Sequence, residues 1–196
     1  MGWMEEGFSM DSNTRGGLLK GLGRAMSGES IFLTTYTSSQ DDAEIAFGSS
    51  FPGKILPVAL EPGKTLIVQK HAFLAAEDGV NLQAHFRKKL GTGFFGGEGF
   101  VLQKLTGNGM AFLEIDGDII EKTLAPGETL QVDQGYIAGF EESVQFDITT
   151  VKGLKNKFFS GEGLFLATLS GPGKIWLQTM PFSVLADRII DRKSVV

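Results

Sequence analysis

The sequence predicts an all-β fold of three repeated antiparallel units, each of the β-sandwich or jelly-roll type, followed by a short C-terminal helix. Three observations support this prediction. The 196-residue chain repeats itself at a spacing of 64 residues. Its apolar segments are short and rich in Val, Ile, Leu, Phe and Thr, and glycine or proline turns separate them. Short strands spaced about 8 to 12 residues apart are typical of sandwiches and barrels.

The repeat is clearest in the second half of the chain. A shift of 64 residues places residues 94–115 over residues 158–179 with 10 identities in 22 positions, where composition alone would give about one or two. The same shift places residues 54–69 over residues 118–133. Duplication at a fixed period indicates a repeat architecture. We therefore divide a single compact chain into a first repeat at 1–53, a second at 54–117, and a third with the C-terminal helix at 118–196.

The first repeat is degenerate and begins in the middle of the unit. Residues 27–37 (SGESIFLTTYT) resemble residues 160–170 (SGEGLFLATLS). Residues 4–11 (MEEGFSMD) likewise parallel residues 140–147 (FEESVQFD). In this second alignment Met1 corresponds to Ile137, so residues 118–136 have no counterpart in the first repeat. We therefore expect about 19 or more additional residues upstream in the natural protein. The intact mass of the native protein would check this expectation.

Turn residues mark the ends of the predicted strands. Proline fixes φ at the second position of a turn and glycine accepts the positive φ at the next, so a Pro-Gly pair fits a type II turn or a tight hairpin. The turn sequences are EPGK (61–64), TGNG (106–109), APGE (125–128) and SGPG (170–173). The strands predicted around them cover residues 65–68, 99–105, 111–115, 129–132, 143–150 and 174–179.

The C-terminal segment has a different periodicity. Phe182, Leu185, Ala186, Ile189 and Ile190 recur at helical spacing, and charged residues lie between them. This pattern predicts an amphipathic helix that caps the last repeat.

Composition excludes several classes of protein. The chain has no cysteine, which excludes a disulfide framework, a thiolate metal site and a cysteine nucleophile. Its 27 glycines are about twice the average usage, and we interpret them as turn residues of the repeated unit. A net charge of −5 has the wrong sign for a general nucleic-acid binder. No apolar run is long enough to span a membrane.

Several segments carry a resemblance to a known family. SGESIFLT, LAPGETLQVD, GEGLFLATLSGPGKIWLQ and MPFSVLADRI resemble the family named for mitochondrial biogenesis (altered inheritance of mitochondria), over essentially the whole chain. The resemblance implies a fold like that of the tryptophan RNA-binding attenuation protein, with three sandwich-like repeats related to double-stranded β-helices. Fungal members are tied to mitochondrial membrane organisation, whereas this sequence has no transit peptide, which favours a prokaryotic, cytoplasmic protein. The family implies no catalytic residues.

Each repeat contains one Gly-Glu motif, for which there are two interpretations. The three carboxylates could converge near a pseudo-threefold axis and bind a metal or share a proton. Alternatively, each motif is a strand-entry turn whose glycine permits a bulge and whose carboxylate accepts backbone N–H groups. We favour the structural interpretation, because a residue that repeats with a fold usually serves the fold. The motif residues are Gly28, Glu29, Gly97, Glu98, Gly99, Gly161, Glu162 and Gly163.

A glycine-containing basic loop precedes each motif. If the three loops share one edge, they form a basic and apolar face suited to anionic lipid headgroups or to an acidic protein partner. In the alternative that we favour, the cations only solvate exposed turns, while neighbouring phenylalanines fill the core. The loop cations are Arg15, Lys20, Arg24, Arg87, Lys88, Lys89, Lys152, Lys155 and Lys157.

Motifs of catalysis and metal binding are missing from the sequence. His71 and His85 are the two histidines, and they lack the His-x-His pairing of a cupin-type metal site. Neither a P-loop nor a G-x-S-x-G sequence occurs. We therefore expect no enzymatic activity, no cofactor and no bound metal.

The leading functional interpretation is a structural or scaffolding protein that forms a homo-oligomer through its sheet edges or sandwich faces. A peripheral contact with membranes is an additional option. RNA binding by analogy with the fold is one alternative, although fold does not determine function and the acidic balance disfavours it. Binding of a small ligand between repeats is another.

Overall fold

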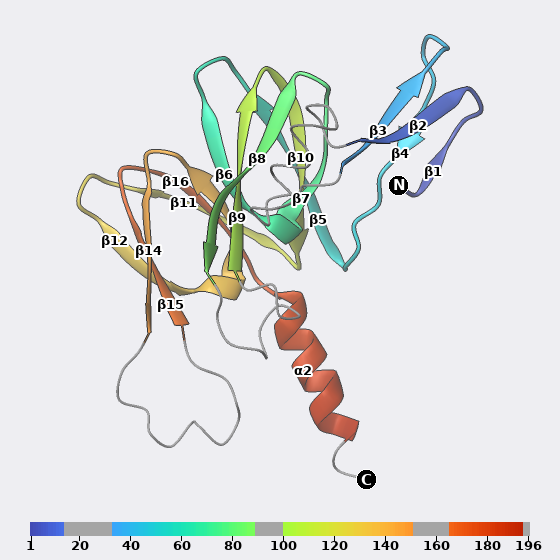
Figure 1. The fold of residues 1–196 in the computed structure, drawn as a ribbon. Coiled ribbons are helices and arrows are strands. Elements are labelled where there is room, and N and C mark those ends of the chain that lie inside the picture. Colours follow the sequence, from blue (N-terminus) through green and yellow to red (C-terminus); the bar gives the residue numbers. More distant parts are fainter. Residues whose placement is uncertain (14–32, 89–99, 151–164, 194–196) are drawn as a thin grey trace. The chain divides into compact units, whose positions relative to one another are not determined.

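The computed structural model describes residues 1–13, 33–88, 100–150 and 165–193 (Figure 1). The chain divides into two compact units, Met1–Gly48 and Ser49–Val196, which we describe separately. Among the described residues, the regular elements are antiparallel strands, two one-turn 3₁₀ helices and one α-helix. The predicted all-β fold class with a short C-terminal helix is therefore confirmed.

The described part of Met1–Gly48 forms two antiparallel strand pairs. Strand β1 (Trp3–Met4) pairs with β4 (Ile45–Ala46), and β2 (Phe8–Asn13) pairs with β3 (Leu33–Ser38). The pairs differ in length, since β1 and β4 have two residues each and β2 and β3 have six.

In Ser49–Val196 one series of elements occurs twice, with counterparts 64 residues apart. The first series is β5 (Gly53–Leu60), β6 (Thr65–Gln69), η1 (Lys70–Ala72), β7 (Phe73–Ala76), β8 (Val80–Lys88), β9 (Phe100–Gly107) and β10 (Gly109–Asp116). The second series is β11 (Ile119–Leu124), β12 (Thr129–Asp133), η3 (Gln134–Tyr136), β13 (Ile137–Glu141), β14 (Gln145–Thr150), β15 (Phe165–Ser170) and β16 (Gly173–Gln178).

The two series also pair their strands in the same way. In the first, β10 lies between β5 and β7, and β9 lies between β6 and β8. In the second, β16 lies between β11 and β13, and β15 lies between β12 and β14. One additional pair, β13 with β6, joins the series into a six-stranded sheet of order β11-β16-β13-β6-β9-β8 (Figure 1).

The hydrophobic core is shared between the two series. Phe100 of the first series packs in one cluster with Phe140 of the second, and both are almost fully buried. The ring of Phe146 stacks on each of them, with centroid distances of 5.6 Å. Burying a side chain of this size stabilises the fold by about 1.5–3 kcal/mol. Side-chain packing in the core therefore links the two series in addition to the pairing of β6 with β13.

Two of the predicted Pro-Gly turns, at residues 61–64 and 125–128, have the predicted geometry, whereas the Gly171–Pro172 peptide bond in the third, at residues 170–173, is cis. The N–H of Lys64 donates to the carbonyl of Glu61, and the N–H of Glu128 donates to that of Ala125, both at 3.0 Å. The glycine at the third turn position has a positive φ, +85° at Gly63. A positive φ at this position is the signature of a type II turn.

The predicted C-terminal helix is α2 (Phe182–Lys193). Its first N–H, that of Phe182, donates to Asp116 Oδ2 at 2.8 Å, and the Phe182 ring meets Phe51 edge to face. Phe182 and Ile189 remain 61% and 58% exposed, so the predicted apolar face of the helix is only partly covered. Within the described part of the chain, no helix has the length and apolar character needed to cross a membrane.

Candidate interaction surface at two strand edges

The structure leaves the residues of the repeated Gly-Glu motif outside its described part. The same is true of the loop cations Arg15, Lys20, Arg24, Lys89, Lys152, Lys155 and Lys157. Arg87 and Lys88 end strand β8, opposite Val101 and Phe100. The favoured structural role of the motif glutamates and the alternative of their convergence therefore stay predictions, as do the two interpretations of the basic loops. The motif residues concerned are Gly28, Glu29, Gly97, Glu98, Gly99, Gly161, Glu162 and Gly163.

The two histidines lie on separate elements. His71 is exposed in η1, and His85 is exposed in β8. Over the described residues, no three His, Asp or Glu side chains come close enough together to hold a metal ion.

The junction between the two series is the β6·β13 pair, in which Gly139 lies opposite Val68. The backbones approach closely at this point. A Cβ atom on Gly139 would lie 2.9 Å from the carbonyl oxygen of Ile67 and 3.2 Å from Val68 Cγ1. Glycine is therefore the residue that this junction accepts without rearrangement.

The hydrogen-bond pattern shows which backbone groups of β6 point at β13. The N–H of Glu142 donates to the carbonyl of Thr65 at 3.4 Å. Because hydrogen-bonded positions alternate along an antiparallel ladder, the N–H and C=O groups of Thr65 and Ile67 face β13, while those of Leu66 face β9.

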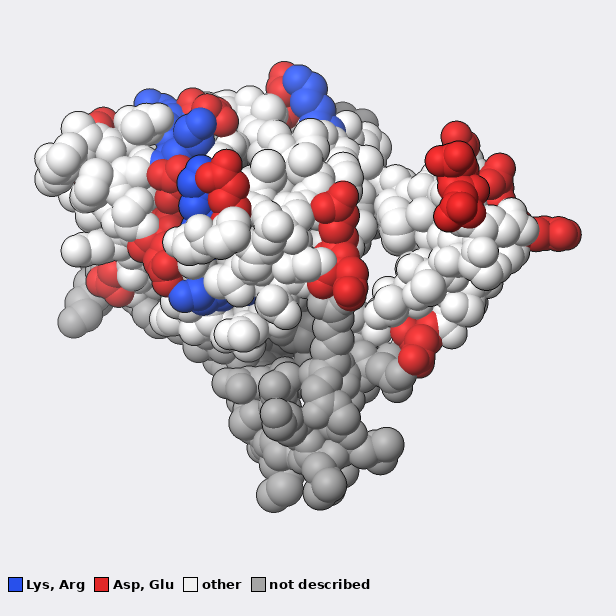
Figure 2. All heavy atoms as spheres, turned by 90° about the horizontal axis from the view of Figure 1, so that it is seen from above, with Lys and Arg blue, Asp and Glu red and all other residues white. Residues whose placement is uncertain are grey.

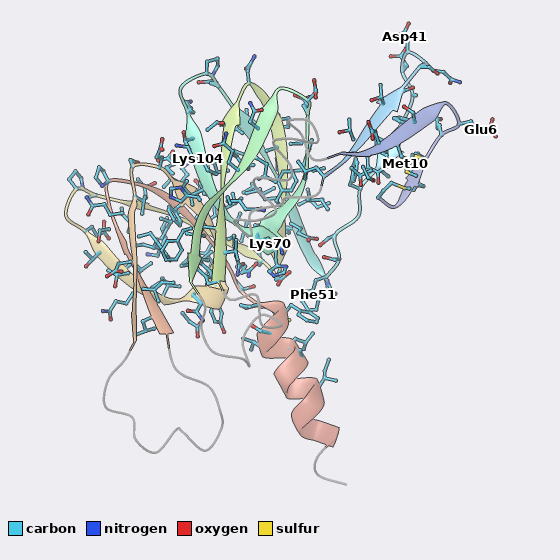
Figure 3. All side chains as sticks on the ribbon, in the orientation of Figure 1. Glu6, Met10, Asp41, Phe51, Lys70 and Lys104 are labelled. Atoms are coloured by element: carbon cyan, nitrogen blue, oxygen red, sulfur yellow. The ribbon has the colours of Figure 1, made fainter. Side chains whose placement is uncertain are left out.

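Charged side chains also meet across this junction. Lys104 Nζ forms an ion pair with Glu142 Oε1, and this contact holds the pKa of the Glu142 carboxyl below its ordinary value. The pKa of Lys64 is raised, first by its ion pair with Glu61 and further by the carboxylate of Glu141. Figure 3 shows Lys104 on the strands of the six-stranded sheet.

Strand β7 is the counterpart of β13, but its outer edge has no strand partner in the described part of the chain. It pairs with β10 alone, with the same register shift that β13 shows against β16. The N–H of Glu77 donates to the carbonyl oxygen of Met110 at 2.9 Å. Because hydrogen-bonded positions alternate along an antiparallel strand, the N–H and C=O groups of the preceding residue, Ala76, point away from β10. Glu77 and Asp78 are exposed and occupy the positions of Glu141 and Glu142.

Strand β12 is the counterpart of β6, and its outer edge likewise has no strand partner among the residues that the structure describes. It pairs with β15 alone. By the alternation found in β6, the outward-facing backbone groups are those of Thr129 and Gln131, whose side chains are exposed. Glu128 occupies the position that Lys64 has before β6.

Two glutamates at corresponding positions bind backbone groups. Glu77 Oε2 accepts from the N–H of Met110 at 2.7 Å, and Glu141 Oε2 accepts from that of Lys174 at 2.8 Å. Each contact ties the end of a strand, β7 or β13, to the start of its antiparallel partner, β10 or β16. These carboxylates therefore have a structural role that the sequence analysis missed, although the 64-residue shift aligns them.

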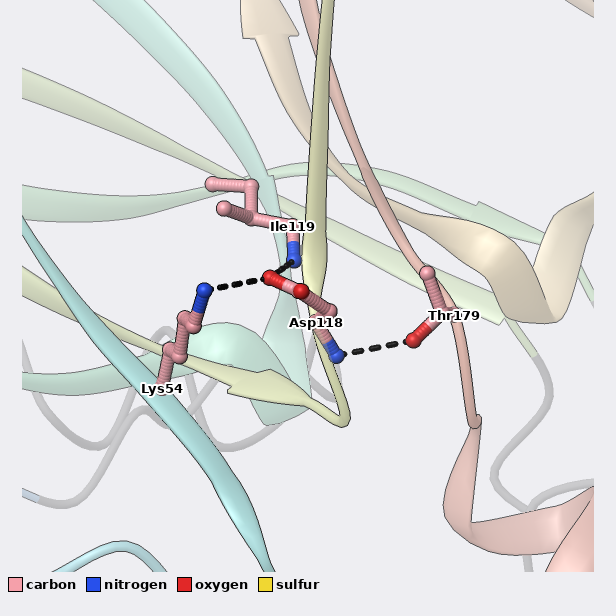
Figure 4. Close-up of polar contacts among 4 residues, drawn as sticks. All are labelled: Lys54, Asp118, Ile119 and Thr179. Atoms are coloured by element: carbon pink, nitrogen blue, oxygen red, sulfur yellow. Dashed lines mark hydrogen bonds and ion pairs between the residues drawn. The ribbon is translucent and has the colours of Figure 1, made fainter.

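A second polar cluster lies where β11 begins (Figure 4). Asp118 Oδ1 accepts from the N–H of Ile119 at 2.7 Å and forms an ion pair of 2.6 Å with Lys54 Nζ. The N–H of Asp118 donates to Thr179 Oγ1 at 2.8 Å. The Lys54 ammonium holds the pKa of Asp118 below its ordinary value. This cluster connects the first strand of each series to the end of β16.

Charge is distributed differently in the two units. In Ser49–Val196, Lys and Arg side chains lie between Asp and Glu side chains on the face that Figure 2 shows. The described part of Met1–Gly48 carries acidic side chains and no Lys or Arg. Its acidic residues, all exposed, are Glu5, Glu6, Asp11, Asp41, Asp42 and Glu44.

Comparison with known proteins identifies the family. The model of the family described as mitochondrial biogenesis AIM24 matches residues 1–180. An uncharacterised protein of Streptococcus pyogenes serotype M6 is 30% identical over 167 residues, which cover 84% of this chain and 65% of that relative. The chain thus spans about two thirds of the length of this relative.

A crystal structure of a Streptococcus pyogenes protein, solved as a structural genomics target, has the same fold. It superposes with a TM-score of 0.77 at 24% identity and covers 98% of this chain and 85% of its own. The expected family resemblance is confirmed by the match over residues 1–180: this chain belongs to the mitochondrial biogenesis AIM24 family.

Proposed function

We propose that this chain is a non-enzymatic structural protein that self-associates through an open sheet edge, in the cytoplasm of a prokaryote. The observation that carries the proposal is the edge of β12, where strand pairing stops among the described residues. An open edge presents unpaired N–H and C=O groups, which are a template for another strand.

The chemistry of β12 favours pairing with a second copy of itself. Two β12 strands related by a twofold axis would run antiparallel, with Gln131 opposite Gln131 of the second copy and Thr129 opposite Asp133. The side chains of Thr129 and Gln131 are uncharged, so no like charges meet at the centre of the strand pair. Twofold dimers are the commonest homo-oligomers.

Such a dimer would join two copies of the sheet β12-β15-β14 into one sheet of six strands. The chain already contains a sheet of this size, formed when β13 adds to β6. The proposed dimer would therefore repeat, between chains, a way of joining three-stranded sheets that is present within the chain.

Sedimentation velocity tests the proposal over a concentration range of about two orders of magnitude. Gln131→Pro removes an outward-facing N–H without removing a bond to β15, so we expect a monomer with nearly unchanged thermal stability. Thr123→Pro is the matched control. It changes an exposed residue of edge strand β11, whose N–H faces away from β16, and should leave the dimer intact.

A monomeric wild-type protein across this range would refute self-association. Dimers that persist in Gln131→Pro would place the contact elsewhere on the molecule.

The absence of catalysis is part of the proposal. Among the described residues, carboxylates with defined partners bind backbone N–H groups, hydroxyls, lysines or the Trp176 indole; Glu114, for example, accepts from Ser49 and Ser50 at 2.8–3.1 Å. These contacts hold elements of the fold together, and none of them pairs two carboxylates as an acid and a base.

The basic loops support a second proposal, a peripheral contact with an anionic membrane surface. Nine of the 18 Lys and Arg residues fall in the three loops described above, and such clusters are attracted by anionic lipids. Sedimentation with vesicles that contain or lack an anionic lipid tests this idea. Binding that needs the anionic lipid and falls with salt supports it, and equal sedimentation with both vesicles refutes it.

Filter binding of RNA at several salt concentrations tests the nucleic-acid alternative.

A further inference from the structure

We propose that the outer edge of β7 is a docking site for an extended segment of another polypeptide, one that carries a lysine followed, after one residue, by a run of apolar residues. This is the chemistry of residues 61–69 (EPGKTLIVQ), whose strand β6 fills the corresponding edge of β13. The proposal does not depend on self-association through β12.

The first support is the equivalence of β7 and β13. Each strand pairs with the last strand of its own series, β10 or β16, with the same register shift at the same position. The edge of β13 is covered by β6, and Ala138 and Gly139 are buried. The counterparts on β7, Leu74 and Ala75, are only partly buried. The β7 edge therefore has the form of a strand acceptor that no described strand fills.

The second support is charge. In the β6·β13 junction, Lys64 is attracted to Glu141, and Lys104 forms an ion pair with Glu142. Glu77 keeps an exposed acidic side chain at the position of Glu141 on the β7 edge. A docked strand with a lysine in the place of Lys64 would gain the same attraction.

Charge also excludes one occupant. Strand β12 of a second copy would bring Glu128, the counterpart of Lys64, next to Glu77. Opposed like charges destabilise a strand pair. The β7 edge is therefore suited to a lysine-bearing segment and not to β12.

The backbone groups define the register of the docked strand. The outward N–H and C=O of Ala76 would pair with the residue that takes the place of Ile67, as Phe140 pairs with Ile67 in β13.

One difference makes the docking weaker than the internal junction. Ala75 stands where β13 has Gly139, and a Cβ at Gly139 would lie 2.9 Å from the carbonyl oxygen of Ile67. A strand docked on β7 must therefore shift outward, which lengthens its hydrogen bonds. A reversible partner tolerates such a contact better than a permanent neighbour does.

The experiment uses a fluorescein-labelled peptide of residues 61–69 and the full chain, with binding followed by anisotropy. Methylation of the peptide nitrogen at Ile67 removes a donor that would face β7, and we expect binding to fall by about tenfold or more. Methylation at Leu66 removes a donor that faces away, and binding should stay within about twofold of the parent peptide. A Lys64→Glu peptide should bind about three- to tenfold more weakly, with the difference lost at high salt.

On the protein, Ala76→Pro should abolish peptide binding, and Thr123→Pro should leave it unchanged. Absence of binding to the parent peptide, or equal binding of the two methylated peptides, would overturn the proposal. Gln131→Pro separates it from the proposed self-association: this variant should bind the peptide like the wild type, whether or not the wild type forms dimers.

Discussion

Lys104 of β9 and Glu142, which follows β13, form an ion pair that passes over β6, the strand between them. The contact joins residues from the two series of strands. It lies on the one strand pair, β6·β13, that connects these series in the six-stranded sheet. The junction thus combines a glycine-dependent close approach with a surface ion pair.

Removal of this ion pair should have a small effect. We expect Lys104→Met to lower Tm slightly at low salt and not at high salt, because both side chains are partly exposed and exposed pairs contribute little. Since the pKa of Glu142 is depressed, its contribution is present above the ordinary pKa of a glutamate and is lost as pH falls through the folded-state value. Thermal melts at two salt concentrations, with Lys122→Met as the control, would check this. A loss of Tm that is independent of salt would contradict it.

Addition of a methyl group at the junction should be more costly. Gly139→Ala places a Cβ against the backbone of Ile67, and we expect a loss of about 1–3 kcal/mol in the free energy of unfolding. Gly135→Ala is the control, because its Cβ would meet atoms only at 3.4 Å or beyond. Urea denaturation measures both variants, and equal losses would show that the close approach is not the cause.

The sequence predicts the individual strands of this junction but not how they pair. The 64-residue shift and the Pro-Gly turns predict strands such as residues 65–68 and 129–132, which match β6 and β12 closely. The same shift aligns β7 with β13 and does not say which of them receives β6. Ala75 and Gly139 differ at the point of closest approach, and Lys104 meets Glu142 across the junction. These are contacts between distant segments, which periodicity does not encode.

The helix shows a similar limit. Its spacing predicts α2 correctly, because Phe182, Leu185 and Ile189 recur at helical intervals. The same pattern implies that these side chains are buried, whereas Phe182 and Ile189 are mostly exposed. The helix is anchored by the hydrogen bond from the N–H of Phe182 to Asp116. This bond joins residues about one repeat apart in the sequence, so no local pattern predicts it.

Asp116 should respond to pH in the opposite sense to Glu142. Burial raises the pKa of Asp116, and the N–H of Phe182 only partly opposes this. The charged carboxylate therefore lowers the stability of the fold above the folded-state pKa. This loss is relieved as pH falls through that pKa. We expect Asp116→Asn, which keeps an acceptor for Phe182, to raise stability at neutral pH by a few tenths of a kcal/mol, after allowance for solvent screening.

Asp116→Ala is the matched comparison, since it removes both the charge and the acceptor. We expect it to lower stability by about 1 kcal/mol. Chemical denaturation at pH 7 and pH 4.5 would check both variants. A destabilised Asp116→Asn at neutral pH would contradict the assignment of a buried charge.

Glu121 holds the indole of Trp176, and its loss should be visible in fluorescence. Trp176 Nε1 donates to Glu121 Oε2 at 2.9 Å, and Lys174 Nζ lies 2.9 Å from Oε1. Lys174 depresses the pKa of Glu121, so this support is present at neutral pH and is lost in acid. In a Trp3→Phe background, we expect Glu121→Ala to shift the emission of Trp176 to the red and Glu121→Gln, which keeps an acceptor, to shift it less. Equal spectra for the two variants would argue against the hydrogen bond.

The position of β6 has a consequence for synthesis of the protein. Its buried residues Ile67 and Val68 lie between β9, which soon follows it, and β13, which is made more than a whole repeat later. On the ribosome, the nascent chain therefore keeps an apolar strand edge uncovered until the second series emerges. Truncation after the first series would leave that edge permanently open and prone to aggregation. The two series are consequently one folding unit, although each has a complete set of strands.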